Sequence, residues 1–253
     1  MTDSPEQYNV CLVNPAQLPE WFWLPTAHLI QEAGHNYFIP PLPRGTITAT
    51  VEDSVDVIEE TMQDKEQQFI VVLSRGVEFG VRYIDRLVKK RSLANVMGWM
   101  VISSVGPRGY TNVESPDDNM PLSRHTSLYS SGVTMQDGLE TMDPENAMDC
   151  MLHDIDDERL QTITLNNLIN ERPLSMTEVA SVPHLPPNIL PLSWYIGLQD
   201  RVDNTALSAV VAKQAFGVEP SYTNWGHVGP LSHTEEVFKA ILSEAHKARQ
   251  ETI

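Results

Sequence analysis

The sequence predicts an α/β protein whose sheet is mostly parallel and carries helices on both faces. Short apolar runs, the clearest at residues 9–13 and 69–73, alternate with stretches of helical spacing. Each run stops at a turn-forming segment, as expected of strands that are buried on both faces. The 253 residues suffice for one large domain with a sizeable core.

The first half of the chain follows this alternation without interruption. The strand at residues 9–13 stops at Asn14-Pro15, helical spacing covers residues 20–33, and Gly34 is suited to end that helix. The elements predicted next are a strand at 36–40, a helix at 50–62, a strand at 69–73, a helix at 79–90 and a strand at 97–103.

The pattern changes after residue 107. Residues 107–145 are rich in Ser, Asp, Asn, Gly and Pro and show no strong period, whereas residues 147–170 predict one or two helices. The alternation then resumes with a strand at 192–196, a helix at 205–215, a short strand at 221–223 and a helix at 234–247. We therefore predict an α/β core of residues 1–107 and 188–253. A helical cap, 108–187, is inserted over the carboxyl ends of the strands.

Charge and cysteine content exclude several classes of protein. With 17 basic and 34 acidic residues the formal net charge is −17, which disfavours nucleic acid and membrane surfaces as partners. The two cysteines, Cys11 and Cys150, are far apart in a chain that needs no disulfide. Residues 1–8 lack the basic start of a signal peptide, and no apolar run is long enough to span a bilayer. We expect a cytoplasmic protein.

The candidate site lies where the predicted strands end, because ligands of open α/β sheets bind at the carboxyl ends of strands. Four such ends carry polar or turn-forming residues. They are residues 14–16, 74–78, 197–200 and 225–227, which contribute in chain order a turn, a second turn, Asp200 and His227.

This arrangement resembles the α/β-hydrolase superfamily over nearly the whole chain, most closely the branch of hydroxynitrile lyases, plant methylesterases and small bacterial esterases. Segment 226–237, Gly-His-Val-Gly-Pro-Leu-Ser-His-Thr-Glu-Glu-Val, is similar to the family's catalytic histidine and final helix. Segments similar to other family features are 10–16 with Trp21, 32–35, 40–45, 149–154, 168–179 and 197–200. The resemblance implies the α/β-hydrolase fold with a cap.

Asp200 and His227 form the predicted acid–histidine pair. Their chain order agrees with the nucleophile–acid–histidine order of the fold. In that geometry the carboxylate of Asp200 fixes the tautomer of the imidazole, and the other ring nitrogen of His227 faces the pocket as a base. A structural histidine beside an aspartate is the alternative.

The nucleophile turn departs from the family's Gly-x-Ser-x-Gly pattern. With a strand at 69–73, residues 74–78 fill the five positions and Gly76 replaces the serine. In the competing alignment Ser74 is the nucleophile, and Val72 then stands where the tight turn requires glycine. We favour Gly76 on this steric argument, so that the turn carries no nucleophile.

The oxyanion turn is altered as well. Asn14-Pro15 replaces His-Gly, and Pro15 has no N–H to donate. The N–H groups of Ala16 and Val77 and the side-chain amide of Asn14 are the remaining candidate donors. We expect Asn14, Ala16 and Val77 to line the substrate site together with Gly76 and Trp21.

Three functions are compatible with this site. The favoured one is a non-hydrolytic lyase, cyclase or isomerase in which His227 and Asp200 carry out acid–base chemistry on an apolar small molecule. The alternatives are a serine esterase that uses Ser74 and a non-catalytic ligand-binding protein on the same fold. The remaining histidines lack metal-ligand spacing and no phosphate-binding glycine motif occurs, so no cofactor and no metal are predicted. A homodimer is left open.

Overall fold

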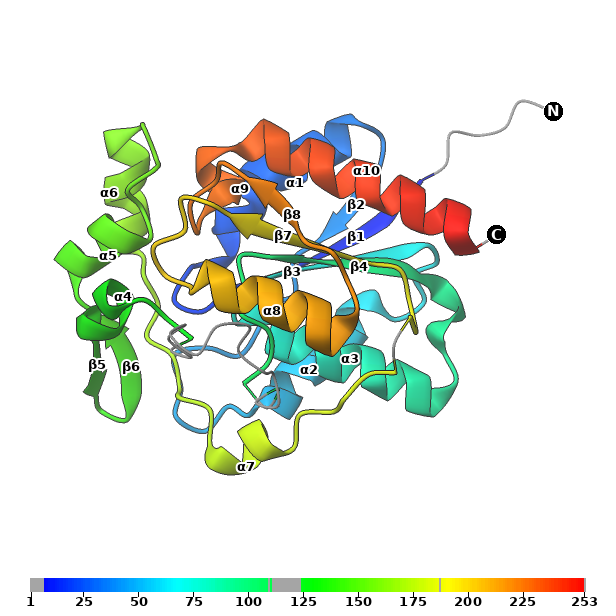
Figure 1. The fold of residues 1–253 in the computed structure, drawn as a ribbon, viewed down its shortest axis with the longest axis horizontal. Coiled ribbons are helices and arrows are strands. Elements are labelled where there is room, and N and C mark those ends of the chain that lie inside the picture. Colours follow the sequence, from blue (N-terminus) through cyan, green and yellow to red (C-terminus); the bar gives the residue numbers. More distant parts are fainter. Residues whose placement is uncertain (1–6, 109, 111–123, 187, 253) are drawn as a thin grey trace.

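The computed structural model describes residues 7–108, 110, 124–186 and 188–252. Residues 1–6, 109, 111–123, 187 and 253 lie outside the described part, so the predicted polar N-terminus and a section of the predicted cap fall largely outside it. In the described residues a six-stranded sheet has the order β2-β1-β3-β4-β7-β8, and every neighbouring pair in it is parallel (Figure 1).

The elements of this core alternate as predicted. The sheet strands are β1 (Asn9–Val13), β2 (Asn36–Phe38), β3 (Gln68–Leu73), β4 (Val96–Ile102), β7 (Leu192–Gly197) and β8 (Ser221–Thr223). The helices around the sheet are η1 (Glu20–Trp23), α1 (Leu24–Glu32), α2 (Val51–Met62), α3 (Gly76–Lys90), η2 (Leu93–Asn95), α8 (Thr205–Phe216), α9 (Gly229–Ser232) and α10 (Thr234–Thr252).

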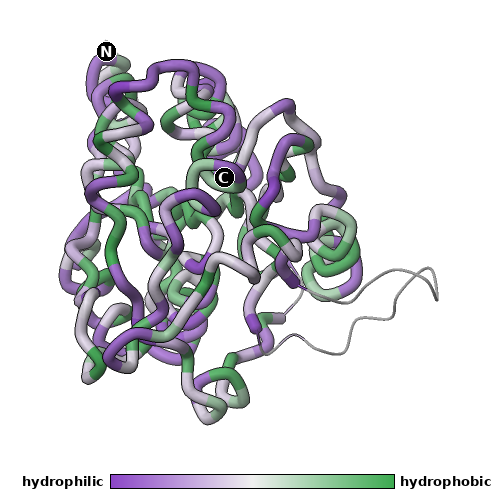
Figure 2. Tube along the Cα trace, turned by 90° about the vertical axis from the view of Figure 1, so that its left-hand side faces the viewer, coloured by the Kyte–Doolittle hydropathy of each residue, from purple (hydrophilic) through white to green (hydrophobic). Residues whose placement is uncertain are grey.

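Two apolar layers cover the faces of the sheet (Figure 1). Helices α2, α3 and α8 pack on one face, and α1 and α10 pack on the other, each layer over its own cluster of buried side chains. Strands β3 and β4 are buried along their whole length, because both faces of the sheet are covered. Hydrophobic and hydrophilic stretches alternate along the helices in Figure 2, as expected of helices with one face on a core.

Between β4 and β7 the chain forms six short elements in the described residues. They are α4 (Ser127–Gly132), β5 (Val133–Gln136), β6 (Leu139–Met142), α5 (Pro144–Cys150), α6 (Glu158–Asn166) and α7 (Met176–Ala180). Figure 1 shows α4, α5, α6 and the β5–β6 hairpin gathered at one end of the molecule. The hairpin was not predicted, although its turn, Asp137-Gly138, is a strong hairpin signal with positive φ at both residues (51° and 81°).

Two further features bear on the site. Helix α3 begins at Gly76, three residues before the predicted start at residue 79, so Gly76 belongs to the helix rather than to the turn before it. None of the helices described is long and apolar enough to cross a membrane.

Candidate active site

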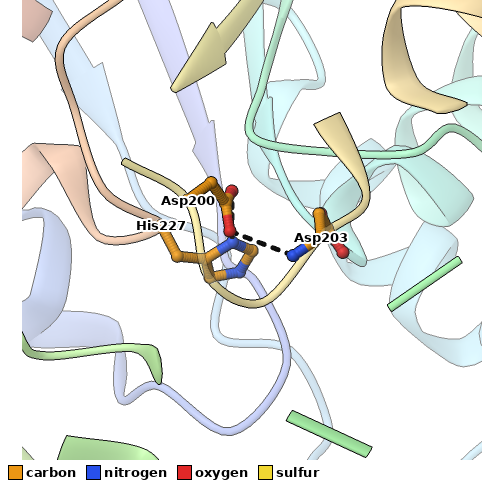
Figure 3. Close-up of side chains that lie close together, drawn as sticks. All are labelled: Asp200, Asp203 and His227. Carbon is orange, nitrogen blue, oxygen red and sulfur yellow. Dashed lines mark hydrogen bonds and ion pairs between the residues drawn. The ribbon is translucent and has the colours of Figure 1, made fainter. Parts of the chain in front are cut away.

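Asp200 and His227 lie side by side on the loops that follow β7 and β8. The Nδ1 of His227 is 2.9 Å from Oδ2 of Asp200, and both side chains are almost wholly buried, with exposed fractions of 2% and 1%. The other carboxylate oxygen of Asp200 accepts the backbone N–H groups of Val202 and Asp203 at 2.8 and 3.0 Å. Figure 3 shows this carboxylate between the imidazole and the backbone of Asp203. The carboxylate is thereby held in one orientation.

Burial and the contact between the two side chains shift the pKa values of both His227 and Asp200. Burial acts to lower the pKa of His227, but the charge and hydrogen bond of Asp200 act more strongly, and the pKa of His227 is raised. Burial acts to raise the pKa of Asp200, but His227 and the two backbone N–H groups hold it below its usual value. The site therefore favours a carboxylate beside an imidazolium whenever His227 receives a proton.

Ser74 occupies the turn between β3 and α3. Its φ is 50°, in the left-handed region, whereas Gly76 is the first residue of the helix. The prediction that Gly76 is the apex of this turn is therefore wrong. The strand ends at Leu73, one residue before the reversal, so the strained conformation falls on the serine. Residues Val72 to Gly76 therefore fill the five positions of the family pattern, as in the competing alignment, with the end of β3 at one side of Ser74 and the start of α3 at the other.

Gly76 has a different role, which is to let the turn approach β1. A β-carbon on Gly76 would lie 3.1 Å from the backbone oxygens of both Val13 and Asn14. A side chain at this position would require the turn and the end of β1, where residues 14–16 begin, to move apart by a few tenths of an ångström. Glycine is therefore required here for packing rather than as a replacement for a nucleophile.

The backbone N–H groups of Ala16 and Arg75 have no partner among the described residues. Both residues line the same pocket as Ser74. The N–H of Val77, which the sequence suggested as a donor, is engaged with the carbonyl oxygen of Ser74 at 3.1 Å. Once Ser74 is the apex, the residue that follows it is Arg75, and its N–H takes the place expected for that of Val77.

Asn14 and Trp21 do not line this pocket. Asn14 is fully buried at the end of β1, and neither polar atom of its side chain has a partner in the described part of the chain. Trp21 lies in η1. Ala16 and Val77, by contrast, line the pocket, although Val77 contributes a side chain there rather than an N–H group.

The pocket joins the strand ends to the segment between β4 and β7. Its volume is about 40 Å³. It is lined by Ala16, Gln17, Ser74, Arg75, Val77, Glu78, Ser104, Val105, Gly106, Arg108, Arg124, His125, Tyr129, Glu140, Met151, Val202, Asp203 and His227. Many of these residues are polar or charged, whereas the sequence led us to expect an apolar substrate.

A larger cavity, of about 410 Å³, lies at the opposite edge of the sheet, near the starts of β4 and β7. Trp99, Leu190 and Phe216 are among its mainly apolar lining residues, and Glu251 is the only ionisable one among the described residues that line it. The smaller cavity is the better candidate because it contains the serine, the histidine and the free N–H groups.

Asp200, Asp203 and His227 offer oxygen and nitrogen atoms that lie within 4.8 Å of one another (Figure 3). Hydrogen bonds account for this proximity. Asp200 bonds His227, and the carboxylate of Asp203 is 2.9 Å from Nδ1 of His125. The cluster consists of two neighbouring histidine–aspartate pairs.

A scan against models of known protein families gives no match, and neither does a search of curated proteins. Solved structures match over almost the whole chain. A histidine-to-alanine variant of polyneuridine aldehyde esterase superposes with a TM-score of 0.74 at 13% identity, covering 94% of this chain and 99% of that one. Tomato methylketone synthase I, solved with β-ketoheptanoate, gives 0.73 at 13%, covering 96% and 99%. A methylesterase from Arabidopsis gives 0.67 at 14%, covering 93% and 98%.

The chain has the α/β-hydrolase fold. At these identities the likeness establishes the fold alone, and any activity has to be argued from the site. In an α/β-hydrolase the nucleophile lies on a strained turn between a strand and a helix. Ser74 has that conformation here, whereas the flanking glycine before it is replaced by Val72.

Sequence reasoning missed several residues of the pocket. Arg75 was hidden by the choice of Gly76 as the apex, and Ser104 follows β4 without a recognisable motif. Arg124 and His125 come from the segment without strong periodicity, and they reach the pocket because residues 124–126 bond to residues 201–204. Only this pairing across the sequence brings them to the site.

Proposed function

We propose that this protein is a serine hydrolase that cleaves a small carboxylic ester through Ser74, His227 and Asp200. The single observation that carries the proposal is the φ of 50° at Ser74, on the strand-to-helix turn that lines one pocket with His227. A serine strained in this way is found where a side chain must stand free of both flanking elements. This proposal replaces the acid–base chemistry favoured from the sequence.

The reaction follows from the roles that each group can fill. The Oγ of Ser74 attacks the ester carbon and its proton passes to Nε2 of His227, while Asp200 stabilises the imidazolium through Nδ1. The N–H groups of Ala16 and Arg75 are placed to stabilise the oxyanion that forms. The bond to the leaving alkoxide breaks as it takes the proton from His227, and water then releases the acid from Ser74.

Covalent labelling with a fluorophosphonate probe tests the proposal. Ser74 should be the labelled residue, and Ser74→Ala should abolish both the labelling and the hydrolysis of 4-nitrophenyl esters. Ser127→Ala is a suitable control because Ser127 is exposed at the start of α4. Labelling that persists in Ser74→Ala would assign the nucleophile to another residue and refute the proposal.

Two observations favour a second candidate, acid–base chemistry without a covalent intermediate. Within the described residues no hydrogen bond joins Ser74 to His227, and Pro15 cannot donate an N–H to an oxyanion. His227 would then act directly on a small apolar substrate. This candidate requires that Ser74→Ala retains turnover while His227→Ala loses it.

A further inference from the structure

Arginine side chains gather in the pocket that contains Ser74 and His227. Arg75, Arg108 and Arg124 all line it, in a chain with twice as many acidic residues (34) as basic ones (17). Arg75 pairs with Glu140 at 3.4 Å. Neither Arg108 nor Arg124 forms a salt bridge with any described residue. Two guanidinium groups without a salt bridge to a described residue therefore line one pocket.

The carboxyl groups of the pocket form no salt bridge with these two arginines in the described part of the chain, although the charges of Glu78 and Asp203 act on Arg124. The carboxylate of Asp203 bonds His125 at 2.9 Å, and Glu140 pairs with Arg75. Glu78 is the third acid, and one of its oxygens accepts the backbone N–H of Arg108. Burial raises the pKa of Glu78, against the opposing effect of that hydrogen bond and of Arg124, Arg82 and Arg108.

Arg124 is fixed close to the nucleophile turn. Its guanidinium donates to the carbonyl oxygens of residues 105–107, at 3.4 Å for Val105 and 3.5 Å for Pro107. This loop is tied to the turn, since Oγ of Ser104 donates to the carbonyl oxygen of Ser74 at 3.0 Å. Carbonyl oxygens hold a guanidinium in place without cancelling its charge. Its Nε–H has no partner among the described residues.

We propose that Arg108 and Arg124 bind a carboxylate at the far end of the acyl group of the substrate. The inference rests on the ester hydrolysis proposed above and specifies its substrate class. Guanidinium groups bind carboxylates with strong, charge-assisted hydrogen bonds. Val77, Val105 and Met151 supply an apolar wall of the same pocket for the chain between the ester and the carboxylate. The substrate would then be the half-ester of a dicarboxylic acid, apolar in the middle and anionic at one end.

Two esters that differ only in this charge test the proposal. We expect mono-4-nitrophenyl adipate to be hydrolysed with a kcat/KM at least about tenfold above that of methyl 4-nitrophenyl adipate, because the charge-assisted contacts are made by the first ester alone. Arg108→Gln and Arg124→Gln should each reduce this ratio towards one. The ratio is measured within each variant, so a partial loss of folded protein affects both rates equally.

The control is Arg159→Gln, since Arg159 is exposed on α6 and lies outside the pocket. It should keep the ratio of the unmodified protein. Arg108→Gln is the more informative variant, because Arg124 also holds residues 105–107. An equal rate for both esters in the unmodified protein, or an unchanged ratio in both arginine variants, would refute the carboxylate site.

A different outcome would separate this inference from the proposed function. If neither ester is hydrolysed, the hydrolase proposal fails and the carboxylate site is tested by binding. Adipate should then raise the Tm of the unmodified protein, dimethyl adipate should not, and Arg108→Gln should abolish the difference. The absence of any shift with adipate would refute the site as well.

Discussion

Val72 on β3 packs directly against Gly80 on α3. A β-carbon built on Gly80 would lie 2.7 Å from Cγ1 of Val72. Val72 occupies the position before the nucleophile turn where the family pattern has glycine, and the side chain fits because α3 has none at Gly80. The valine at the turn and the glycine in the helix thus compensate for each other.

This contact predicts a strong coupling between the two positions. Gly80→Ala alone should destabilise the protein by about 1–3 kcal/mol, because the methyl group overpacks a fully buried valine. In a Val72→Ala background the same change should be neutral or stabilising, since alanine favours a helix interior by about 1 kcal/mol over glycine. Urea unfolding of the four proteins in a double-mutant cycle measures the coupling. Equal effects of Gly80→Ala in both backgrounds would contradict it.

The same contact explains why the turn was misread from the sequence. Val72 argued against Ser74 as the apex, on the rule that the turn is too tight for a side chain there. The rule concerns space, and here the space is provided by Gly80, four residues into the helix after Gly76. Only the packing of α3 against β3 shows that the glycine that provides this space lies in the helix rather than in the strand.

The prediction of other features depended less on knowledge of tertiary contacts. The α/β alternation and the fold class could be predicted because buried parallel strands leave long apolar runs, such as residues 69–73. The chain order of Asp200 and His227 also led to two side chains that are hydrogen-bonded in the structure. Arg124 and His125 could not be predicted, because their position depends on hydrogen bonds to the loop that carries Asp200.

Asp200→Asn should lower kcat by about 10³–10⁴-fold, since an amide that donates to Nδ1 selects the wrong tautomer of His227. The amide oxygen can still accept the N–H groups of Val202 and Asp203, so the loop should keep its conformation. Ester hydrolysis and Tm are the measurements. Asp156→Asn, a change of an exposed aspartate, is the control for the loss of one charge. A fall of less than tenfold in kcat would exclude the proposed role of Asp200.

The activity should rise with pH as His227 loses its proton, because only the neutral imidazole is a base. Since Asp200 raises the pKa of His227 despite burial, the midpoint should lie above the value of about 6.5 for a free histidine. A profile of kcat/KM against pH measures the midpoint. A midpoint at or below the free value would show that Asp200 does not govern the imidazole.

The same shift predicts how stability depends on pH. The folded state binds the proton of His227 more tightly than the unfolded state, so the stabilisation is fully present below about pH 6.5 and is lost as pH rises through the raised pKa. We expect the stability advantage of the unmodified protein over His227→Gln to shrink between neutral and alkaline pH. Urea unfolding at several pH values measures it, and an advantage that grows with pH would have the wrong sign.

Asp154 holds the loop that carries His227. Its Oδ2 accepts the backbone N–H of Gly226 and the hydroxyl of Ser232, both at 2.7 Å, and a β-carbon on Gly226 would lie 2.4 Å from the carboxyl carbon of Asp154. Gly226→Ala should therefore displace His227 or Asp154 and lower kcat/KM by about 10²-fold, the effect expected of a misplacement of about 1 Å.

The second variant distinguishes a displaced histidine from general damage. Asp154→Ala leaves the N–H of Gly226 without a partner, which should cost about 1–3 kcal/mol of stability, whereas the hydroxyl of Ser232 keeps its contact with Nδ1 of His233 at 2.9 Å. In the double variant with Gly226→Ala the clash is absent, so part of the lost activity should return even though the protein is less stable. If the double variant is less active than Gly226→Ala alone, then Asp154 does not position His227 through this contact.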